Sequence, residues 1–274
     1  MLLQLFCCLS VTVHNVIADE GTSYCNKFTQ DCHNMEPPSD SVTALTVVPY
    51  TESQVLPHHR PTRDFHLGGQ DIHIQQNWGS LGVAAVVWDA AIVLCEYLEL
   101  HPEVVRHKQV LELGAGTGLV GIVASYLGKM ELGTGTGIVG IVASYLGGHV
   151  TVTERREAMP NLSKTVDSNR LVSCPGSITV KELDWTADLS PHPKYDIILG
   201  ADIIYIEDTF QALLNTLVHT AREDTSVLLS CRIRYDRDLN FLTLLEGHFH
   251  VEQIHYDKSR DIKIFSAKKI KTKT

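Results

Sequence analysis

The sequence predicts an α/β fold in which helices cover both faces of a mostly parallel sheet. Two observations support this prediction. Between residues 109 and 248, short apolar segments of strand length alternate with longer segments of helical length, an order that places parallel strands next to one another. After residue 248, two strand-like segments follow each other directly and predict an antiparallel hairpin at one edge of the sheet.

The first part of the chain is not expected to belong to this fold. Residues 1–44 begin with an apolar run that is too short to span a membrane, and they continue as a polar stretch with Pro37 and Pro38. The run could serve as a signal-peptide core, but no basic residue precedes it. We therefore expect residues 1–44 to form a disordered N-terminal extension and residues 45–274 to form the folded domain.

Two elements are predicted ahead of the alternating region. Residues 64–77 alternate apolar and polar side chains around Gly68 and Gly69, as a β-hairpin does. Residues 82–98 predict an apolar helix that contains Trp88 and Asp89. The later elements follow the alternation: strands at 110–113, 149–153, 177–183, 195–201, 226–231, 251–256 and 262–267, and helices at 119–127, 157–169, 209–219 and 239–248.

The segment Gln109–Gly118 (QVLELGAGTG) joins a short apolar strand to a glycine turn and an apolar helix. Glycine allows a ligand to approach the backbone closely, and free N–H groups at a helix N-terminus attract negative charge. The spacing of Glu112, Gly114, Gly116 and Gly118 does not fit a dinucleotide motif in register. It resembles the first motif of class I methyltransferases, which bind S-adenosylmethionine and direct the acidic residue toward the amino-acid end of the cofactor. The alternative is a glycine-rich turn that binds no ligand.

The glycine motif occurs twice. Glu112–Gly128 and Glu131–Gly147 start 19 positions apart and differ only at Ala115/Thr134 and Leu119/Ile138. Two copies indicate a local tandem duplication and not a solenoid. Either copy could complete the site, and the first is favoured because its strand, Gln109–Leu113, has the higher β-propensity.

Further polar or aromatic residues follow the next three predicted strands. These are Glu154, Trp185 and Asp202. Ligands of open α/β sheets bind at the carboxyl ends of the strands, where Glu154 could accept hydrogen bonds from ribose hydroxyls and Trp185 could stack on adenine. Taken singly, Glu154 could be a solvated strand end and Trp185 a core aromatic residue.

Asp202 and Tyr205 form a D-x-x-Y segment that suits an amine acceptor. A lysine ammonium has no lone pair, and its unperturbed pKa is about 10.4, so it must lose a proton before it attacks a sulfonium. A buried aromatic wall favours the neutral amine, and a carboxylate orients the nitrogen. The alternative is that Asp202 caps the following helix and that Tyr205 packs on it. The two isoleucines between them argue against a base substrate.

The chain resembles methyltransferase-like family 21 of the seven-strand protein-lysine methyltransferases. The resemblance rests on Asn77–Ala90, the Glu112 motif, Lys181–Trp185, Ile197–Tyr205 and Cys231–Asp238. It implies a seven-stranded Rossmann-like sheet, S-adenosylmethionine as cofactor, and a protein substrate, with seventy-kilodalton heat-shock chaperones as the expected one. It also implies catalytic roles for Asp202 and Tyr205 and cofactor contacts from Trp88, Gly114, Ala115, Gly116, Glu154, Trp185 and Ala201.

Composition limits the classes of partner. The net charge is −9, which disfavours nucleic acid and suits a basic, lysine-bearing surface. Seven cysteines without a disulfide or zinc spacing indicate free thiols in a reducing compartment. We expect a cytoplasmic monomer without a metal or a membrane segment. Two other readings remain open: a non-catalytic chaperone-binding protein whose cofactor site the duplication has disrupted, and a small-molecule methyltransferase.

Overall fold

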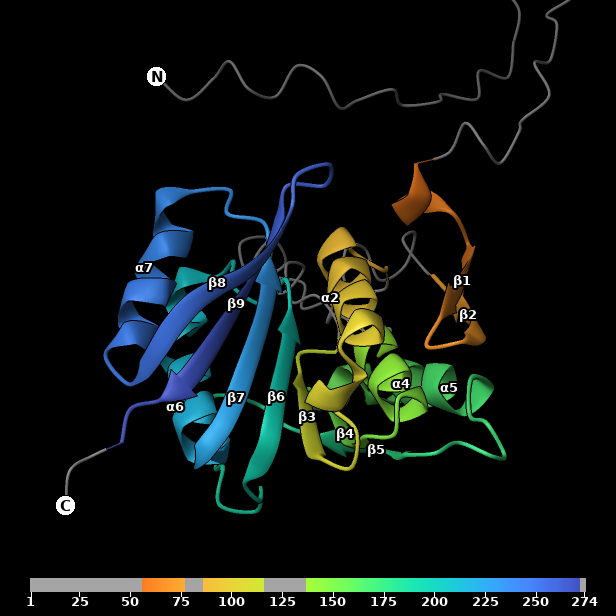
Figure 1. Ribbon diagram of the computed structural model, residues 1–274, viewed down its shortest axis with the longest axis horizontal. Coiled ribbons are helices and arrows are strands. Elements are labelled where there is room, and N and C mark those ends of the chain that lie inside the picture. The colour runs from red at the N-terminus through yellow and green to blue at the C-terminus, as the bar shows by residue number, and fades with distance from the viewer. Residues whose placement is uncertain (1–55, 77–85, 116–136, 272–274) are drawn as a thin grey trace, which may run out of the picture. The chain divides into compact units, whose positions relative to one another are not determined.

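The computed structural model describes residues 56–76, 86–115 and 137–271 (Figure 1). The chain divides into two compact units, Met1–Pro49 and Tyr50–Thr274, and all described residues belong to the second. The expected disordered extension and the predicted helix at 119–127 lie outside the described residues, and the domain boundary near residue 45 remains a prediction. No helix in the described ranges is long and apolar enough to cross a membrane.

A seven-stranded sheet forms the centre of the fold, in the order β5-β4-β3-β6-β7-β9-β8. Strands β3 to β7 are parallel, and β9 runs antiparallel to both β7 and β8. The predicted mostly parallel sheet with a C-terminal antiparallel hairpin is therefore confirmed. The strands are β3 Gln109–Leu113, β4 His149–Glu154, β5 Ser177–Glu182, β6 Tyr195–Ala201, β7 Ala221–Cys231, β8 Phe249–Asp257 and β9 Ile262–Lys269.

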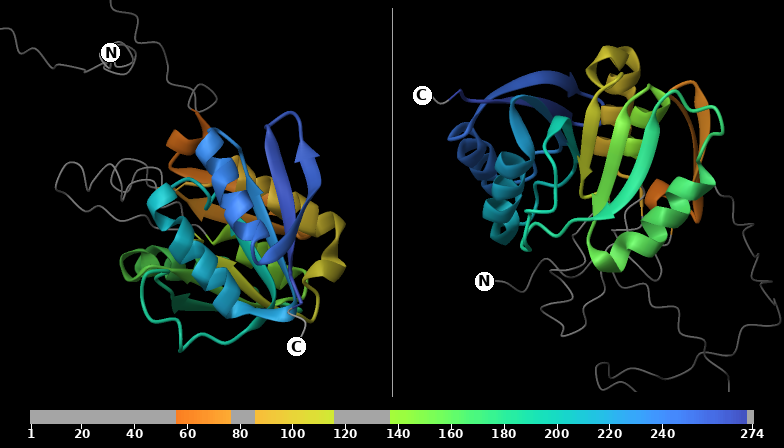
Figure 2. Two further views of the ribbon diagram at one scale, coloured as in Figure 1. Left: turned by 90° about the vertical axis from the view of Figure 1, so that its left-hand side faces the viewer. Right: turned by 90° about the horizontal axis from the view of Figure 1, so that it is seen from below.

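Helices cover both faces of the sheet (Figures 1 and 2). Side chains of successive strand residues point to opposite faces, so Val110 joins the core under one layer of helices while Leu111 and Leu113 join the other. One layer holds α2 Asp89–Leu100, α4 Ile138–Tyr145 and α5 Met159–Ser168, and the other holds α6 Phe210–Thr220 and α7 Asp236–Glu246. Short 3₁₀ turns lie at Pro57–His59, Pro102–Val104, Arg156–Ala158 and Glu207–Thr209.

The predicted hairpin is present as β1 Thr62–Leu67 and β2 Gln70–Gln75, and its turn residues Gly68 and Gly69 both have positive φ. It docks beside α5, where the backbone N–H of His73 donates to the side-chain oxygen of Asn169 over 2.9 Å and the Asn169 amide donates back to the His73 carbonyl over 3.0 Å.

The prediction that Trp88 lies inside a helix from residue 82 is wrong. Residues 86–88 are not helical, and α2 begins at Asp89 with Trp88 as its extended N-cap residue. The physical reason lies in Val87, both of whose backbone groups are engaged by side chains. Its N–H donates to Gln76 over 2.9 Å and its carbonyl accepts from Arg63 over 2.9 Å, so neither is available for a helical hydrogen bond.

The next described helix after β3, α4, comes from the second copy of the repeat. Strand β3 and the first turn residues, Gly114 and Ala115, belong to the first copy, whereas Gly137 and α4 belong to the second. The N–H of Gly137 donates to the Ala115 carbonyl over 3.1 Å, which closes the turn between the two copies. Strand β3 thus comes from the first copy and α4 from the second, and the preference for the first copy as the cofactor site remains a prediction.

Candidate active site

The polar strand ends predicted from the sequence lie along one edge of the sheet. Gly114 follows β3, Glu154 ends β4, Trp185 follows β5, and Asp202 follows β6. These four strands are parallel neighbours in the order β5-β4-β3-β6, so their carboxyl ends meet at the same edge. The chain adds β4 and β5 on one side of β3 and then β6 on the other, and open α/β sheets bind ligands at such a switch point.

The glycine turn has the backbone conformation that its sequence requires. Gly114 and Gly137 have φ values of 57° and 62°, in the left-handed region that favours glycine. A Cβ on Gly137 would lie 2.6 Å from Leu162 Cδ1, so a larger residue would strain the backbone and displace the Leu162 side chain. The N–H of Ala115 donates to the Thr153 carbonyl of β4 over 3.1 Å. Gly116 lies outside the described residues.

Glu112 is buried beneath the glycine turn. Its side-chain oxygen Oε2 accepts the backbone N–H of Gly140 in α4 over 2.9 Å, and the residue is 3% exposed. Burial raises the pKa of Glu112 to about 8, an effect that the Gly140 hydrogen bond opposes and the nearby Glu154 adds to. The contact seen joins β3 to the helix, so the expected role of Glu112 at the amino-acid end of the cofactor remains a prediction.

A cavity of about 230 Å³ opens at the end of β6. It brings together three of the predicted site residues, Trp88, Asp202 and Tyr205. The other lining residues come from the connection between β7 and α7 and from the start of α7, a segment to which the sequence analysis assigned no chemistry: Arg234, Tyr235, Arg237 and Asp238. The lining thus combines three aromatic rings with two carboxylates and two guanidinium groups.

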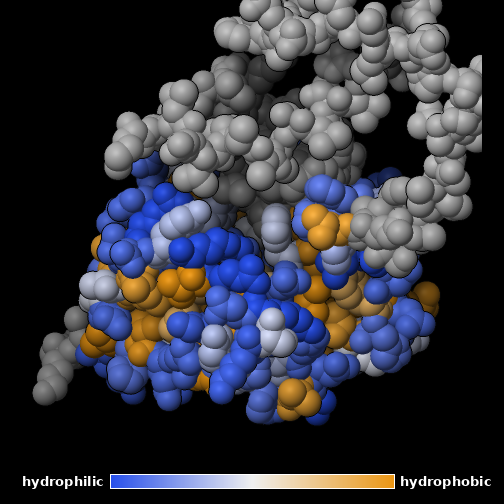
Figure 3. Space-filling model, turned by 90° about the horizontal axis from the view of Figure 1, so that it is seen from above, coloured by the Kyte–Doolittle hydropathy of each residue, from blue (hydrophilic) through white to orange (hydrophobic). Residues whose placement is uncertain are grey.

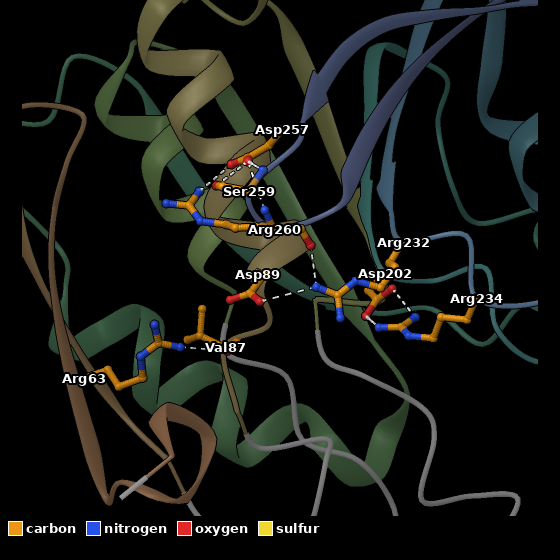
Figure 4. A network of polar contacts seen from close by, with 9 residues as sticks. All are labelled: Arg63, Val87, Asp89, Asp202, Arg232, Arg234, Asp257, Ser259 and Arg260. Atoms are coloured by element: carbon orange, nitrogen blue, oxygen red, sulfur yellow. Dashed lines mark hydrogen bonds and ion pairs between the residues drawn. The ribbon is translucent and has the colours of Figure 1, made fainter. Parts of the chain in front are cut away.

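Asp202 is the buried acid of this cavity, with 7% of its surface exposed and a left-handed φ of 55°. Both of its carboxylate oxygens accept from Arg234, over 2.9 Å from Nη1 and 2.8 Å from Nη2 (Figure 4). Its backbone N–H donates to the Ser230 carbonyl over 2.7 Å. The alternative that Asp202 caps the following helix is wrong, because neither N-cap residue ahead of α6 has a side-chain cap and the carboxylate is bound to Arg234.

Asp238 holds the backbone of the Arg234 segment in place. Its Oδ2 accepts the N–H of Arg234 over 2.8 Å and that of Tyr235 over 3.0 Å, and the residue is 2% exposed. This arrangement starts α7 at Asp236, ahead of the predicted Leu239. Sequence reasoning missed these contacts, although an aspartate ahead of an apolar helical segment is a recognisable N-terminal signal.

Two titratable groups near Asp202 stay protonated. Burial, with the charges of Glu154 and Asp202, raises the pKa of Tyr205, so its hydroxyl remains a hydrogen-bond donor. Burial also raises the pKa of the Cys231 thiol to about 12, with Asp202 and Asp238 contributing. Neither group therefore adds a negative charge to the cavity near neutral pH.

The remaining predicted cofactor contacts surround this centre. Glu154 is 8% exposed, and its Oε1 accepts the N–H of Arg155 over 3.0 Å. Trp185 is half-buried against the core under α6 and α7, and Ala201 packs on the core of the opposite face. Among the described residues, no group of three His, Cys, Asp or Glu side chains could hold a metal ion.

Figure 3 looks onto this edge of the molecule. Hydrophilic side chains form a band across the described surface, between two more apolar areas. The strand ends point toward this side, as the arrowheads of β6 and β7 in Figure 1 show. A polar edge with an aromatic cavity in it suits a site that binds a charged cofactor and a side chain from a larger partner.

Comparisons with known proteins agree with this geometry. The lysine methyltransferase family matches residues 67–130 and 124–248, two segments that overlap inside the repeat. The chain is 46% identical over 236 residues to the zebrafish (Danio rerio) protein N-lysine methyltransferase METTL21A, covering 84% of this chain and 99% of that protein. It is 43% identical to METTL21A of the mouse (Mus musculus), covering 82% and 97%, and 38% identical to mouse EEF1A lysine methyltransferase 3, covering 73% and 79%.

A solved structure shows the same fold. The Thermus thermophilus 16S rRNA N2 G1207 methyltransferase RsmC, in complex with AdoMet and guanosine, aligns with a TM-score of 0.52 at 21% identity, covering 76% of this chain and 50% of that one. The fold and the site define a class I methyltransferase, an enzyme that uses S-adenosylmethionine. Within that class, the chain belongs to the lysine methyltransferase family. The predicted family, fold class and cofactor are thus confirmed.

Proposed function

We propose that this enzyme transfers methyl groups from S-adenosylmethionine to lysine side chains of seventy-kilodalton heat-shock chaperones. The observation that carries the proposal is the cavity at the end of β6, where the buried Asp202 carboxylate lies among the rings of Trp88, Tyr205 and Tyr235. The cavity is large enough for a lysine side chain. The METTL21A relatives are named as protein N-lysine methyltransferases.

The residues present at the strand ends fit the cofactor. Two glycine positions with left-handed backbones, Gly114 and Gly137, follow β3, and the Glu154 carboxylate at the end of β4 has the chemistry to accept hydroxyl hydrogen bonds. We assign cofactor binding to Gly114, Ala115, Gly116, Glu154, Trp185 and Ala201, with Trp88 at the boundary to the acceptor cavity. When bound, S-adenosylmethionine supplies a methyl group on a positively charged sulfur.

The cavity residues bind the lysine side chain that accepts the methyl group. Asp202 orients the lysine nitrogen by accepting one of its N–H groups, and the aromatic rings exclude water from it. A dry aromatic environment favours the neutral amine over the ammonium form. The protonated Tyr205 hydroxyl closes the cavity next to Asp202 without adding charge.

The test is methyl transfer to a purified seventy-kilodalton chaperone, followed by peptide mass spectrometry. We expect methylated lysine with the native chain and about 10²-fold less or lower with Asp202→Asn. Labelling of another protein in a lysate, with the chaperone unlabelled, would refute the proposed substrate. Stable chaperone binding without methylation would instead identify a non-catalytic binding protein, and label on small molecules alone would identify a small-molecule methyltransferase.

We also propose that the enzyme works in the cytoplasm. Cys95, Cys174 and Cys231 are all free thiols, as is usual for proteins of reducing compartments. Fractionation of cells that express the tagged full chain tests this proposal, and we expect the activity in the cytosolic fraction. Recovery with a secreted or organellar fraction would refute it.

A further inference from the structure

We propose that Arg234 is a positioning residue that cancels the charge of Asp202, so that the acceptor amine enters the cavity neutral and ready for methyl transfer. This inference rests on the proposed function, since it concerns a lysine amine next to Asp202. It assigns a role to a residue outside the D-x-x-Y segment. It also explains how a carboxylate can orient an amine without keeping it protonated.

The ion pair between the Arg234 and Asp202 side chains has a strong and fixed geometry. Arg234 donates two parallel hydrogen bonds to the two Asp202 oxygens, over 2.9 and 2.8 Å, the bidentate geometry that is strongest between these groups. The Arg234 side chain is 34% exposed and that of Asp202 is 8% exposed. The backbone on both sides is also fixed, by Asp238 at Arg234 and by the Ser230 carbonyl at Asp202.

A lone carboxylate would be a poor partner for the nucleophile. An opposite charge within about 4–6 Å raises the pKa of an ammonium group by roughly 1–3 units. The reacting lysine would then be held in the form that has no lone pair. With Arg234 in place, the Asp202–Arg234 pair has no net charge, and this contribution disappears.

The other charged groups around the pair do not substitute for Arg234. On the α7 side, Asp238 has Arg237 4.0 Å away; on the α2 side, Asp89 has Arg232 3.9 Å away. The neutral Tyr205 and Cys231 add no charge. Of the more distant groups, Glu154 and Arg155 are opposite in sign, and Lys263 is a cation near Cys231 that does not line the cavity. Loss of Arg234 would therefore leave one uncompensated negative charge at the cavity.

Asp202 can bind the amine and Arg234 at the same time. A carboxylate offers about four lone-pair positions, and Arg234 occupies two of them. The others can accept an N–H of the lysine. Asp202 thus keeps its orienting role while Arg234 removes its effect on the proton.

The test is the pH dependence of lysine methylation on a purified seventy-kilodalton chaperone, between about pH 6 and pH 10. For Arg234→Gln, we expect the methylation rate to rise with pH as in the native enzyme, but at a pH about 1–3 units higher. The two rates should converge at high pH. Arg234→Lys, which keeps the charge, should retain the native profile at a lower rate.

Two further variants separate charge from structure. Asp202→Asn leaves Arg234 uncompensated and should displace the residual profile downward. In the double variant Asp202→Asn/Arg234→Gln, the pair of side chains is neutral again. Its rate should rise over the same pH range as that of the native enzyme, whatever its absolute value. Thermal unfolding and S-adenosylhomocysteine affinity serve as folding controls for each chain.

A second readout does not depend on turnover. Calorimetry in buffers of different ionisation enthalpy counts the protons released when the chaperone binds the enzyme loaded with S-adenosylhomocysteine. We expect about one proton per lysine bound near pH 8 for the native chain and close to none for Arg234→Gln. Equal proton release, or an Arg234→Gln profile that is lowered by the same factor at every pH, would overturn the inference. Absence of lysine methylation by the native chain would refute the proposed function as well.

Discussion

Asp202 is held in a left-handed backbone conformation that asparagine accepts better than alanine. Asp202→Asn therefore removes the charge with little backbone strain. We expect it to reduce methyl transfer by about 10²-fold or more, the scale of a positioned polar group, while the affinity for S-adenosylhomocysteine stays close to native. Activity assays and calorimetry on the same preparation measure both quantities.

Asp208→Asn provides the matched control, because Asp208 is an exposed acid in the turn after Tyr205. We expect native activity from it. Loss of both cofactor binding and folding in Asp202→Asn would mean that Asp202 has only a structural role. Native activity in Asp202→Asn would remove it from the reaction altogether.

Glu112 should make the stability of the ligand-free enzyme fall as the pH rises. It releases its proton at about 8 in the folded chain, against an ordinary pKa of 4.5. Between these values the folded state binds more protons than the unfolded state, so the free energy of unfolding decreases with pH, by on the order of 3–5 kcal/mol. Glu112→Gln keeps the acceptor for Gly140 and should lose this slope, as urea unfolding near pH 5 and pH 8 would reveal. Parallel curves for the two chains would contradict the assignment.

The residues of the site were predictable where a polar or aromatic side chain stands at the end of a predicted strand. Glu154 ends one predicted strand, and Asp202 and Tyr205 follow another, so the shared direction of parallel strands brings them to one edge. Arg234 was not predictable in its role, because its partner lies 32 positions away and sequence spacing carries no information on such a contact. The contact of Glu112 with Gly140 was hidden by the repeat, which offers two equivalent glycines.

At the level of elements, the connection from β3 to α4 depends on Gly137 of the second copy. Gly137→Val should destabilise the fold by about 2–4 kcal/mol, since it adds a left-handed β-branched residue and a clash with Leu162. The matched control is Gly118→Val, at the same motif position of the first copy, and we expect a much smaller change. Thermal unfolding measures both. The reverse result would show that the helix of the first copy occupies the slot.

Gln76, directly after the hairpin β1–β2, connects the hairpin to Val87, the residue next to Trp88 of the site. Its buried side chain accepts from the Val87 N–H and donates to the carbonyls of Pro57 and Arg60, each over 2.9 Å. Gln76→Leu leaves these groups without a partner, and we expect a loss of about 2 kcal/mol or more. The exposed neighbour Gln75 provides the control Gln75→Leu. Equal urea midpoints for the two variants would contradict this role for Gln76.

Element boundaries were predicted best where the apolar pattern alone determines them. Strand β6 matches its apolar run at both ends. The helix start at Asp89 was missed because the residues ahead of it are apolar and helix-compatible, whereas hydrogen bonds from the Arg63 and Gln76 side chains occupy the Val87 backbone. Strand β7 begins at Ala221, earlier than predicted, because Ala221 pairs with Tyr195 of β6 ahead of a register shift. The residues between Ala221 and Ser226 are polar and gave no apolar pattern.

At the scale of the whole molecule, β4 and β5 lie on one side of β3, and the strands that follow lie on the other. The sequence was sufficient to predict a mostly parallel sheet but did not predict this order. It could not decide how a chain with two glycine motifs builds one sheet. The structure resolves this by combining the strand of the first copy with the helix of the second, and the turn closes with the Gly137 to Ala115 hydrogen bond of 3.1 Å.

Calorimetric binding of S-adenosylhomocysteine to the full-length chain tests most directly whether the two copies together form a cofactor site. A deletion of residues 118–136 serves as the reference, because it joins Gly116–Thr117 to Gly137 and shortens the connection from 21 residues (116–136) to two. We expect one-to-one binding by both chains, with the deletion more stable by about 2 kcal/mol from reduced loop-closure entropy. Binding by the deletion but not by a folded full-length chain would contradict the claim that the two copies together form a working cofactor site.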